Sequence, residues 1–236
     1  MRNDLKCPKK IKDIIDELLG DQSLNLIKEG ATFKGVFKDI RELIQLKLTE
    51  YLGTLSNRQE VYNEFSYLVQ AFPNTSGKFG ELLSKELGLG KEGLDKVTKS
   101  DYQFSINIKE TELPFSNKER FNPDEIHYFT EDQLQKSVIV DTKIGDGNFD
   151  PKQLQNYLLL RNNHEEFLKN PPILEEPQIQ LLFLPNGTKD CKLAAEEALD
   201  KIEGLIGQGI IDKKTLEDKH LVIKYLDSDG NIQDLN

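Results

Sequence analysis

The sequence is poor in cysteine and contains no long apolar run. Its two cysteines, Cys7 and Cys191, are too few for a zinc or iron–sulfur site built from thiolates alone, so we expect two free thiols. No segment approaches the roughly 18 consecutive apolar residues that a transmembrane helix needs. The first residues also lack the apolar core of a signal peptide. We therefore expect a soluble, cytoplasmic protein that does not interact with a membrane.

Positive charge is scarce in the second part of the chain. The formal net charge is −10, and residues 101–236 hold 15 basic against 26 acidic side chains. This acid excess argues against extensive contact with nucleic acid, because phosphate contacts require clustered lysine and arginine. Binding of a phosphate backbone would therefore need metal ions or a local basic groove.

The first third of the chain has helical patterns. Apolar residues recur at helical spacing in three segments, residues 8–19, 36–52 and 57–72. A turn signal at 73–77 is followed by a short helix that ends near Gly88. These features predict an N-terminal helical region over residues 1–75 and a second region over residues 76–236.

Beyond Lys99 the pattern changes to that of β-strands. Apolar and polar residues alternate from Tyr102 to Ile108, as in a half-buried strand. Further strands are predicted at residues 125–129, 137–143, 179–184 and 220–226, with helices at 150–169 and 194–206. The run Val138–Val140 is apolar on both faces, which predicts a central strand. The sequence thus predicts an α/β fold with a mixed sheet flanked by helices.

The segment Asp141-Thr142-Lys143 places two charged side chains at the end of the apolar strand. Asp-x-Lys or Glu-x-Lys triplets occur six times in the chain, but only this one closes a fully apolar strand. Side chains separated by one residue in a strand lie on the same face. Because burial of an unpaired charge is costly, Asp141 and Lys143 must find partners or a metal ion there.

The preceding hairpin predicts a second carboxylate at this position. If Phe129 and Lys136 flank the turn, the antiparallel register sets Asp124 opposite Asp141. Directly opposed like charges destabilise a sheet, so a cation between them is the natural solution. A hard divalent ion held by few carboxylates and several waters is typical of Mg²⁺, with Mn²⁺ as a substitute.

The helix after this strand begins with Asp150-Pro151-Lys152-Gln153. Asp150 is predicted as the N-cap and Pro151 as the first helical residue. Gln153 completes a variant of the capping box, which explains this residue without any catalytic role. Lys152 and Arg161 on the same helix are candidates for a phosphate-facing, nucleic-acid-binding edge, and a solvated helix face is the alternative.

Pro123-Asp124, sixteen intervening residues and then Asp141-Thr142-Lys143 resemble the active-site motif of the PD-(D/E)xK nuclease superfamily. The resemblance implies a restriction-endonuclease-like fold. It also implies that Asp124 and Asp141 bind the catalytic metal, and that Lys143 helps to position or activate the attacking water.

The resemblance extends to three further residues and covers roughly residues 76–185. Gln153 and Tyr157 look like the Gln-x-x-x-Tyr motif of the RecB-like branch, where it contributes to the active site. Glu81, in a helix before the sheet, matches the position of an accessory acid that many members carry, which implies a catalytic role for it as a third metal ligand. No four-cysteine cluster accompanies these motifs, so the iron–sulfur variants of that branch are excluded.

Each of these residues also has a purely structural explanation. Lys143 can neutralise Asp141 in an ordinary surface hairpin. Tyr157 can be a core residue, and Glu81 can be solvated beside apolar helix residues. The three histidines show no spacing typical of metal ligands, and we assign no role to them.

The function expected from the resemblance is Mg²⁺-dependent hydrolysis of DNA phosphodiester bonds. An endonuclease of restriction, defence or repair is favoured, because the chain contains no helicase or other motor motif. An exonuclease and an RNA nuclease with the same site are alternatives. A non-catalytic interaction module on a nuclease fold is the rival from another class, and homodimerisation is left open.

Two glycine–aspartate segments, residues 145–148 and 227–231, look like fragments of calcium loops. Neither has the acid spacing and the terminal glutamate of an EF-hand. Tight turns explain both segments.

Overall fold

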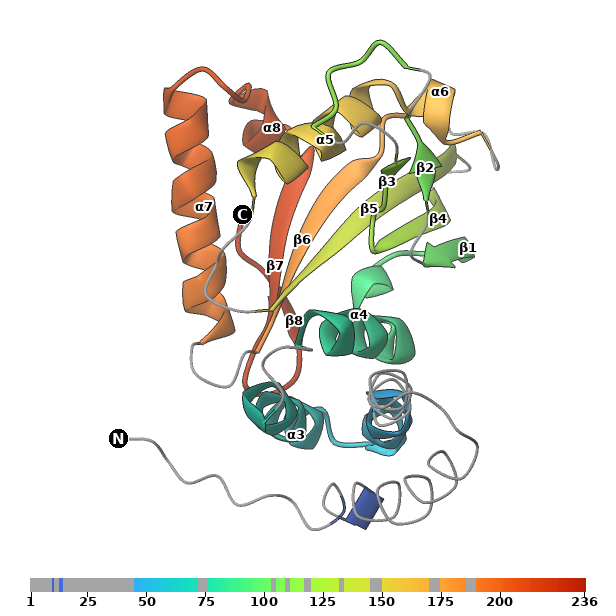
Figure 1. Ribbon diagram of the computed structural model, residues 1–236, viewed down its shortest axis with the longest axis vertical. Coiled ribbons are helices and arrows are strands. Elements are labelled where there is room, and N and C mark those ends of the chain that lie inside the picture. The colour runs from blue at the N-terminus through green and yellow to red at the C-terminus, as the bar shows by residue number, and fades with distance from the viewer. Residues whose placement is uncertain are drawn as a thin grey trace, which may run out of the picture.

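Six strands form one mixed sheet in the order β1-β4-β5-β6-β7-β8 (Figure 1). The strands are β1 (Val97–Tyr102), β4 (Glu125–Glu131), β5 (Leu134–Ile144), β6 (Gln178–Leu184), β7 (Leu221–Leu226) and β8 (Ile232–Asp234). Pairing is antiparallel from β1 to β5, parallel from β5 to β7, and antiparallel between β7 and β8. The computed structural model describes residues 10, 13–14, 45–71, 76–102, 105–108, 111–116, 120–131, 134–144, 150–169, 175–185 and 190–236.

Strand β5 lies inside the sheet, between β4 and β6. Its residues Val138, Ile139 and Val140 are fully buried. A strand covered on both faces needs apolar side chains at successive positions rather than at alternate ones. The prediction of a central strand is therefore confirmed.

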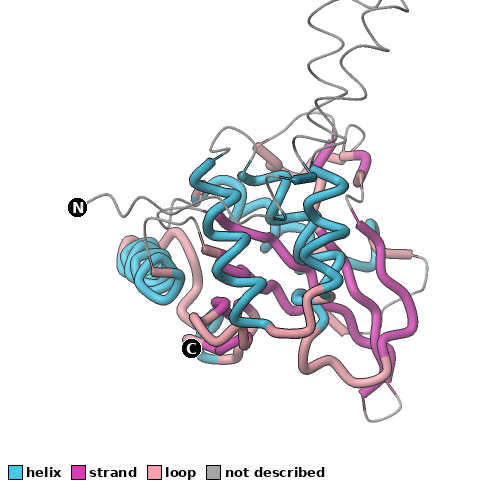
Figure 2. The backbone as a smooth tube through the Cα atoms, turned by 90° about the horizontal axis from the view of Figure 1, so that it is seen from below, coloured by secondary structure: helices cyan, strands magenta, loops and turns pink. Residues whose placement is uncertain are grey.

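Helices cover both faces of the sheet. One face packs against α5 (Pro151–Asn162), α6 (His164–Phe167), α7 (Cys191–Gly207) and α8 (Lys214–Glu217). The other face packs against the helical residues 45–54, α3 (Arg58–Ala71) and α4 (Ser76–Leu87). In Figure 2 helices lie across the strands, and α7, the upright helix of Figure 1, is seen end-on beside them. The coarse prediction of an α/β fold with a mixed, helix-flanked sheet is confirmed.

The helices before residue 72 share a hydrophobic core with the sheet. Leu48 and Leu52 lie in the same buried cluster as Val138, Val140 and Leu182. The predicted helix at 57–72 corresponds to α3, and the short helix expected before Gly88 corresponds to α4. Of the predicted helix at 36–52, residues 36–44 lie outside the described part of the chain, and so does most of the helix predicted at 8–19.

The single strand predicted from Tyr102 to Ile108 is wrong. Strand β1 ends at Tyr102, and β2 (Ile106–Asn107) pairs with β3 (Arg120–Phe121) in a separate two-stranded sheet. Ile106, Ile108 and Phe121 are buried in the core on the α5 side. Burial of these apolar side chains above the main sheet stabilises the separate two-stranded sheet. The alternating pattern of residues 102–108 is compatible with this arrangement as well as with one continuous strand.

The predicted helix at 150–169 begins as expected and ends earlier. The Asp150 carboxylate accepts a hydrogen bond from the Lys152 backbone N–H at 2.9 Å, with Pro151 as the first helical residue. The helix breaks at Asn163, and only the single turn of α6 follows. Asparagine is a weak helix former, and its side chain competes for backbone partners: the Asn163 amide donates to the Leu159 carbonyl at 2.8 Å.

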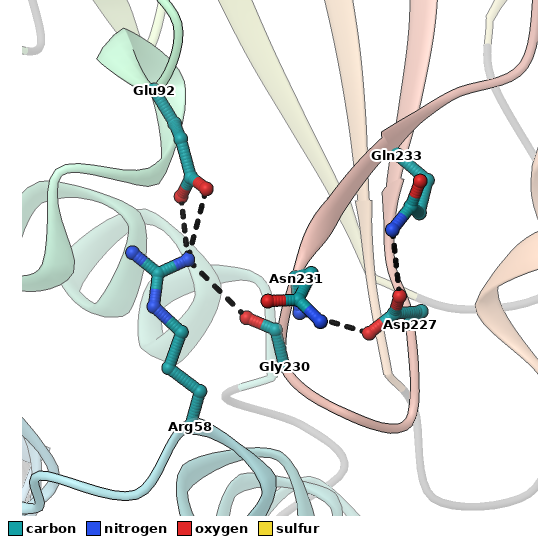
Figure 3. Close-up of polar contacts among 6 residues, drawn as sticks. All are labelled: Arg58, Glu92, Asp227, Gly230, Asn231 and Gln233. Atoms are coloured by element: carbon teal, nitrogen blue, oxygen red, sulfur yellow. Dashed lines mark hydrogen bonds and ion pairs between the residues drawn. The ribbon is translucent and has the colours of Figure 1, made fainter.

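The segment 227–231 forms the tight turn between β7 and β8, as predicted. The Asp227 carboxylate accepts hydrogen bonds from the backbone N–H groups of Asp229 and Asn231 and from the Gln233 side chain. Figure 3 shows the contacts of Asp227 with Asn231 and Gln233. Arg58 reaches this turn from α3, forming an ion pair with Glu92 at 2.7 Å and a long hydrogen bond to the Gly230 carbonyl at 3.4 Å. Residues 145–148 lie outside the described residues.

Two further expectations concern cysteine and the membrane. Cys191 is a buried free thiol at the start of α7, and burial raises its pKa to about 12. Cys7 lies outside the described residues. None of the described helices has the length and apolar character that crossing a bilayer requires.

Candidate active site

The β4–β5 hairpin has the register predicted from the sequence. Phe129 pairs with Lys136, and Glu125 pairs with Val140. Asp124 precedes the first residue of β4, so the same register sets it opposite Asp141. Its carboxylate oxygen Oδ2 accepts a hydrogen bond from the backbone N–H of Thr142 at 2.8 Å. The two predicted carboxylates therefore meet at the end of the central strand.

Lys143 connects this carboxylate pair to α5. Its ammonium nitrogen Nζ lies 2.6 Å from Oδ2 of Asp141, and Asp141 is 3 % exposed. The same nitrogen donates a hydrogen bond to the Gln153 side-chain oxygen at 2.8 Å. Gln153 thus contacts the predicted catalytic lysine, while Asp150 supplies the cap of the helix.

Tyr157 forms the buried wall of the site, one helical turn after Gln153. The residue is fully buried and packs edge-on against Phe121, which also makes it a core residue. Its hydroxyl lies within the influence of Asp141 and Gln153 but has no hydrogen bond of good geometry to a described residue. Burial, followed by the charges of Asp141 and Asp124, raises the Tyr157 pKa well above its ordinary value. The hydroxyl is therefore neutral and can act as a hydrogen-bond donor.

Asp124 has a strongly perturbed acidity. Burial is the largest cause, and the charge of Asp141 adds to it, so that the pKa of Asp124 is raised to about 8. The hydrogen bond from Thr142 N–H acts in the opposite direction, because it favours the ionised form. Without a cation, burial and the charge of Asp141 therefore favour the protonated form of Asp124.

Glu81 approaches the site from α4, on the other side of the sheet. A side chain at Gly80 would overlap Ile144 at the end of β5, so glycine permits this close approach of helix and strand. The charge of Glu81 contributes to the raised pKa of Asp124. Glu81 is thus within electrostatic range of the pair, and its role as an accessory acid and metal ligand stays a prediction.

The carboxylate pair fits a hard divalent cation in its chemistry. Mg²⁺ prefers oxygen ligands, retains several waters, and is commonly held by one or two protein carboxylates. Asp124 and Asp141 offer two such groups, whose proximity is unfavourable without a cation. Within the described residues, no group of three or more histidine, cysteine, aspartate or glutamate side chains is arranged to hold a metal ion. A metal here would therefore depend on two carboxylates and water.

The two predicted nucleic-acid-binding residues do not lie together. Arg161 is 7 % exposed, and its guanidinium pairs with Glu176 at 2.5 Å. Lys152 is exposed in the first turn of α5. Nine residues correspond to about two and a half turns, so the two side chains leave opposite sides of the helix. Only Lys152 is placed to meet a phosphate backbone in solvent.

Two features of the site were not predicted from the sequence. The Thr142 backbone N–H donates a hydrogen bond to Asp124, and a backbone group of this kind cannot be recognised from the order of side chains in the sequence. Gly80 directly precedes Glu81, but its contact with Ile144 depends on how α4 packs on the sheet. A glycine inside an otherwise regular helix was the available indication of close approach.

The opposite face of β4 carries a buried network of polar side chains that was likewise not predicted from the sequence. His127 contacts Glu125 through Nε2 and Ser100 through Nδ1, each at 2.8 Å. The alternation Glu-x-His on a strand indicates that both side chains share one face. Gly90 lies against this pair, where an added Cβ would be 3.0 Å from the Glu125 carboxylate. The network therefore joins β1 to β4 inside the protein rather than forming an open site.

Comparison of the chain with protein-family models, with curated proteins and with solved structures found no match. The resemblance to PD-(D/E)xK nucleases therefore rests on the residues of this sequence alone.

Proposed function

We propose that the protein is a Mg²⁺-dependent nuclease that hydrolyses DNA phosphodiester bonds, with a restriction-endonuclease-like core. One observation carries the proposal. A continuous set of contacts joins Thr142 N–H, Asp124, Asp141, Lys143 and Gln153 across two strands and a helix, at the positions that the motif requires. Six Asp-x-Lys or Glu-x-Lys triplets occur by composition, but a chance triplet has no reason to place a second aspartate and a glutamine around it.

The residues divide the chemical tasks between them. Asp124 and Asp141 would hold the cation, with Glu81 near enough to add negative charge. A bound Mg²⁺ supplies Lewis-acid activation of the phosphoryl group and lowers the pKa of a bound water. Lys143, held between Asp141 and Gln153, places a positive charge beside the region where negative charge develops. Tyr157 and its neighbours exclude water from the back of the site.

The preference for endonuclease action and for DNA is part of the proposal. The test incubates the purified protein with supercoiled plasmid, end-labelled duplex, single-stranded DNA and RNA, each with Mg²⁺, Mn²⁺ or EDTA. Nicking or linearisation of the plasmid in Mg²⁺, and none in EDTA, is the expected result. Release of mononucleotides from ends only would assign an exonuclease, and cleavage of RNA alone would assign a ribonuclease with the same site.

A binding module without catalysis is the second candidate. The direct ion pair between Lys143 and Asp141 is also what an inert hairpin would contain, and the acidic second half of the chain suits a basic protein partner. The same assay separates the two candidates, because a module would leave every nucleic acid intact with either metal.

A further inference from the structure

A cavity of about 580 Å³ lies on the opposite side of α5 from Gln153 and Tyr157. Its walls are α5, the segment between α7 and α8, and α8 itself, which lies beside α5 in Figure 1. Its lining does not include Asp124, Asp141 or Lys143. The volume falls in the range of about 300–1,000 Å³ that is typical of pockets for small molecules. The cavity is thus a second candidate site, independent of the nuclease proposal.

One part of the cavity wall is apolar and accessible. Leu158, Leu159 and Ile210 line it, and Ile210 is 46 % exposed. An exposed isoleucine in the lining of a concave site leaves apolar surface in contact with water. A ligand with an apolar body would remove this surface from water and gain free energy by doing so.

Another part of the wall is cationic. Arg161 is 7 % exposed, and its Nε–H has no acceptor among the described residues. Lys214, at the start of α8, also lines the cavity and is exposed. The one carboxylate in the lining belongs to Asp212, which accepts a hydrogen bond from the Lys214 backbone N–H at 2.9 Å and so serves the helix end. Because Glu176 already pairs with one nitrogen of the Arg161 guanidinium, the groups in the lining that can bind a ligand are the Arg161 Nε–H and the Lys214 ammonium, and both favour an anionic group.

A smaller cavity on the other side of Arg161 differs in charge. Its volume is about 350 Å³, and its lining includes Glu131, Glu175, Glu176, Asp95 and Asp218. These five carboxylates outnumber the basic side chains Lys136, Arg161 and Lys219 there. We therefore expect an anion to bind in the larger cavity rather than in this acidic one.

We propose that the larger cavity binds an amphipathic organic anion. The apolar body, an aromatic ring or a nucleobase, packs against Leu158 and Ile210. Its single carboxylate or phosphate group lies at Arg161 and Lys214. The apolar body alone would not contact the cationic side chains, and the anionic group alone would not cover the apolar side chains.

Isothermal titration calorimetry tests the proposal, with EDTA present so that no metal links a phosphate to the carboxylate pair. The probes are 2-naphthoate and adenosine 5′-monophosphate, compared with inorganic phosphate and with uncharged 2-naphthol. Saturable binding of 2-naphthoate, of the nucleotide, or of both is expected, each tighter than the two comparison compounds. Whichever probe binds identifies the carboxylate or the phosphate as the source of the charge.

Three variants localise the binding. Lys214→Glu and Ile210→Glu should each weaken it by at least about tenfold. Lys213→Glu is the matched control, because this neighbouring lysine is 70 % exposed and does not line the cavity. All three positions are exposed, and melting curves verify that the variants fold. The proposal is overturned by absence of binding up to about 1 mM, by equal loss in the Lys213 control, or by unchanged binding in either cavity variant.

Discussion

At the scale of single residues, the most consequential feature is the contact between Asp124 and Asp141. Two adjacent, partly buried carboxylates repel each other unless a proton, an ammonium group or a metal ion neutralises part of their charge. Lys143 compensates Asp141 directly, whereas Asp124 has only the Thr142 N–H and a raised pKa of about 8. Metal binding and acid–base behaviour at this site are therefore linked through Asp124.

The raised pKa of Asp124 predicts how stability depends on pH in EDTA. Because the folded state binds this proton more tightly than the unfolded chain, Asp124 contributes stability below about pH 4, and this contribution is lost as pH rises through about 8. Asp124→Asn removes the titration. The variant should match the wild type near pH 4 and exceed it increasingly as pH rises, by a few kcal/mol, to order of magnitude, at pH 9.

The measurement is urea unfolding across this pH range, with Asp229→Asn as control in an exposed turn. A constant difference between Asp124→Asn and wild type at every pH would refute the assigned origin of the shift.

At the scale of elements, local sequence patterns predicted the β4–β5 hairpin. The split between β1 and β2 and the burial of Arg161 depend on contacts between residues that are distant in the sequence. The apolar run at Val138–Val140 and the turn before Lys136 were sufficient for the register that brings Asp124 to Asp141. The split between β1 and β2 was not predictable, because the alternation at 102–108 does not reveal that Ile106 pairs with Phe121. The burial of Arg161 likewise depends on Glu176, a residue that arrives from the segment before β6.

The packing of α4 on β5 can be tested at Gly80. An alanine there overlaps Ile144, so Gly80→Ala should destabilise the protein by about 1–3 kcal/mol. Gly77→Ala in the same helix is the control, because its Cβ meets nothing within 4 Å; its stability should be unchanged or slightly higher. Thermal unfolding measures both. Adding Ile144→Val to Gly80→Ala shortens the obstructing side chain and should recover part of the lost stability. Equal melting temperatures for Gly80→Ala and Gly77→Ala would contradict this packing.

Gly230 in the β7–β8 turn and Gly209 after α7 form a second pair of glycines for comparison. Gly230 has φ of 80° and lies against Arg58, where an added Cβ would overlap the α3 backbone (Figure 3). Gly209 has φ of 70° but open space around it. Both alanine variants suffer the strain of a left-handed backbone, so the difference between them isolates the contact with α3. Chemical denaturation should show Gly230→Ala to be less stable than Gly209→Ala by about 1–3 kcal/mol, and the reverse order would argue against the contact.

At the scale of the whole molecule, the charge of −10 controls the approach of a nucleic acid. The acid excess of the chain repels phosphate when no metal is bound, and Arg161 is already paired with Glu176. Fluorescence anisotropy in EDTA should therefore show weak binding to a labelled DNA duplex that falls steeply with salt. Lys152→Ala should weaken it further and reduce the salt slope by about one. Tight, salt-insensitive binding in EDTA would be incompatible with this charge distribution.

The described part of the N-terminal region belongs to the same core as the sheet. Leu48 and Leu52 pack in the cluster that contains Val138 and Val140, on the face opposite Asp141. Helical spacing predicted these helices but not their partner, because periodicity identifies an apolar face and not the surface that covers it. These residues support β5 from behind and thereby hold the end of the strand that carries the carboxylates.

The proposed active site is tested by the DNA cleavage of Asp141→Ala and Lys143→Ala, measured beside melting curves with and without Mg²⁺. Both variants should fold and lose cleavage, since each lacks one part of the contact chain at the end of β5. Mg²⁺ should still raise the melting temperature of Lys143→Ala, because an ammonium has no lone pair to offer a metal, and should no longer raise that of Asp141→Ala. Asp229→Ala, in an exposed turn, should cleave like the wild type. Wild-type cleavage by a folded Asp141→Ala protein, or a wild-type protein inert on every nucleic acid, would contradict the account.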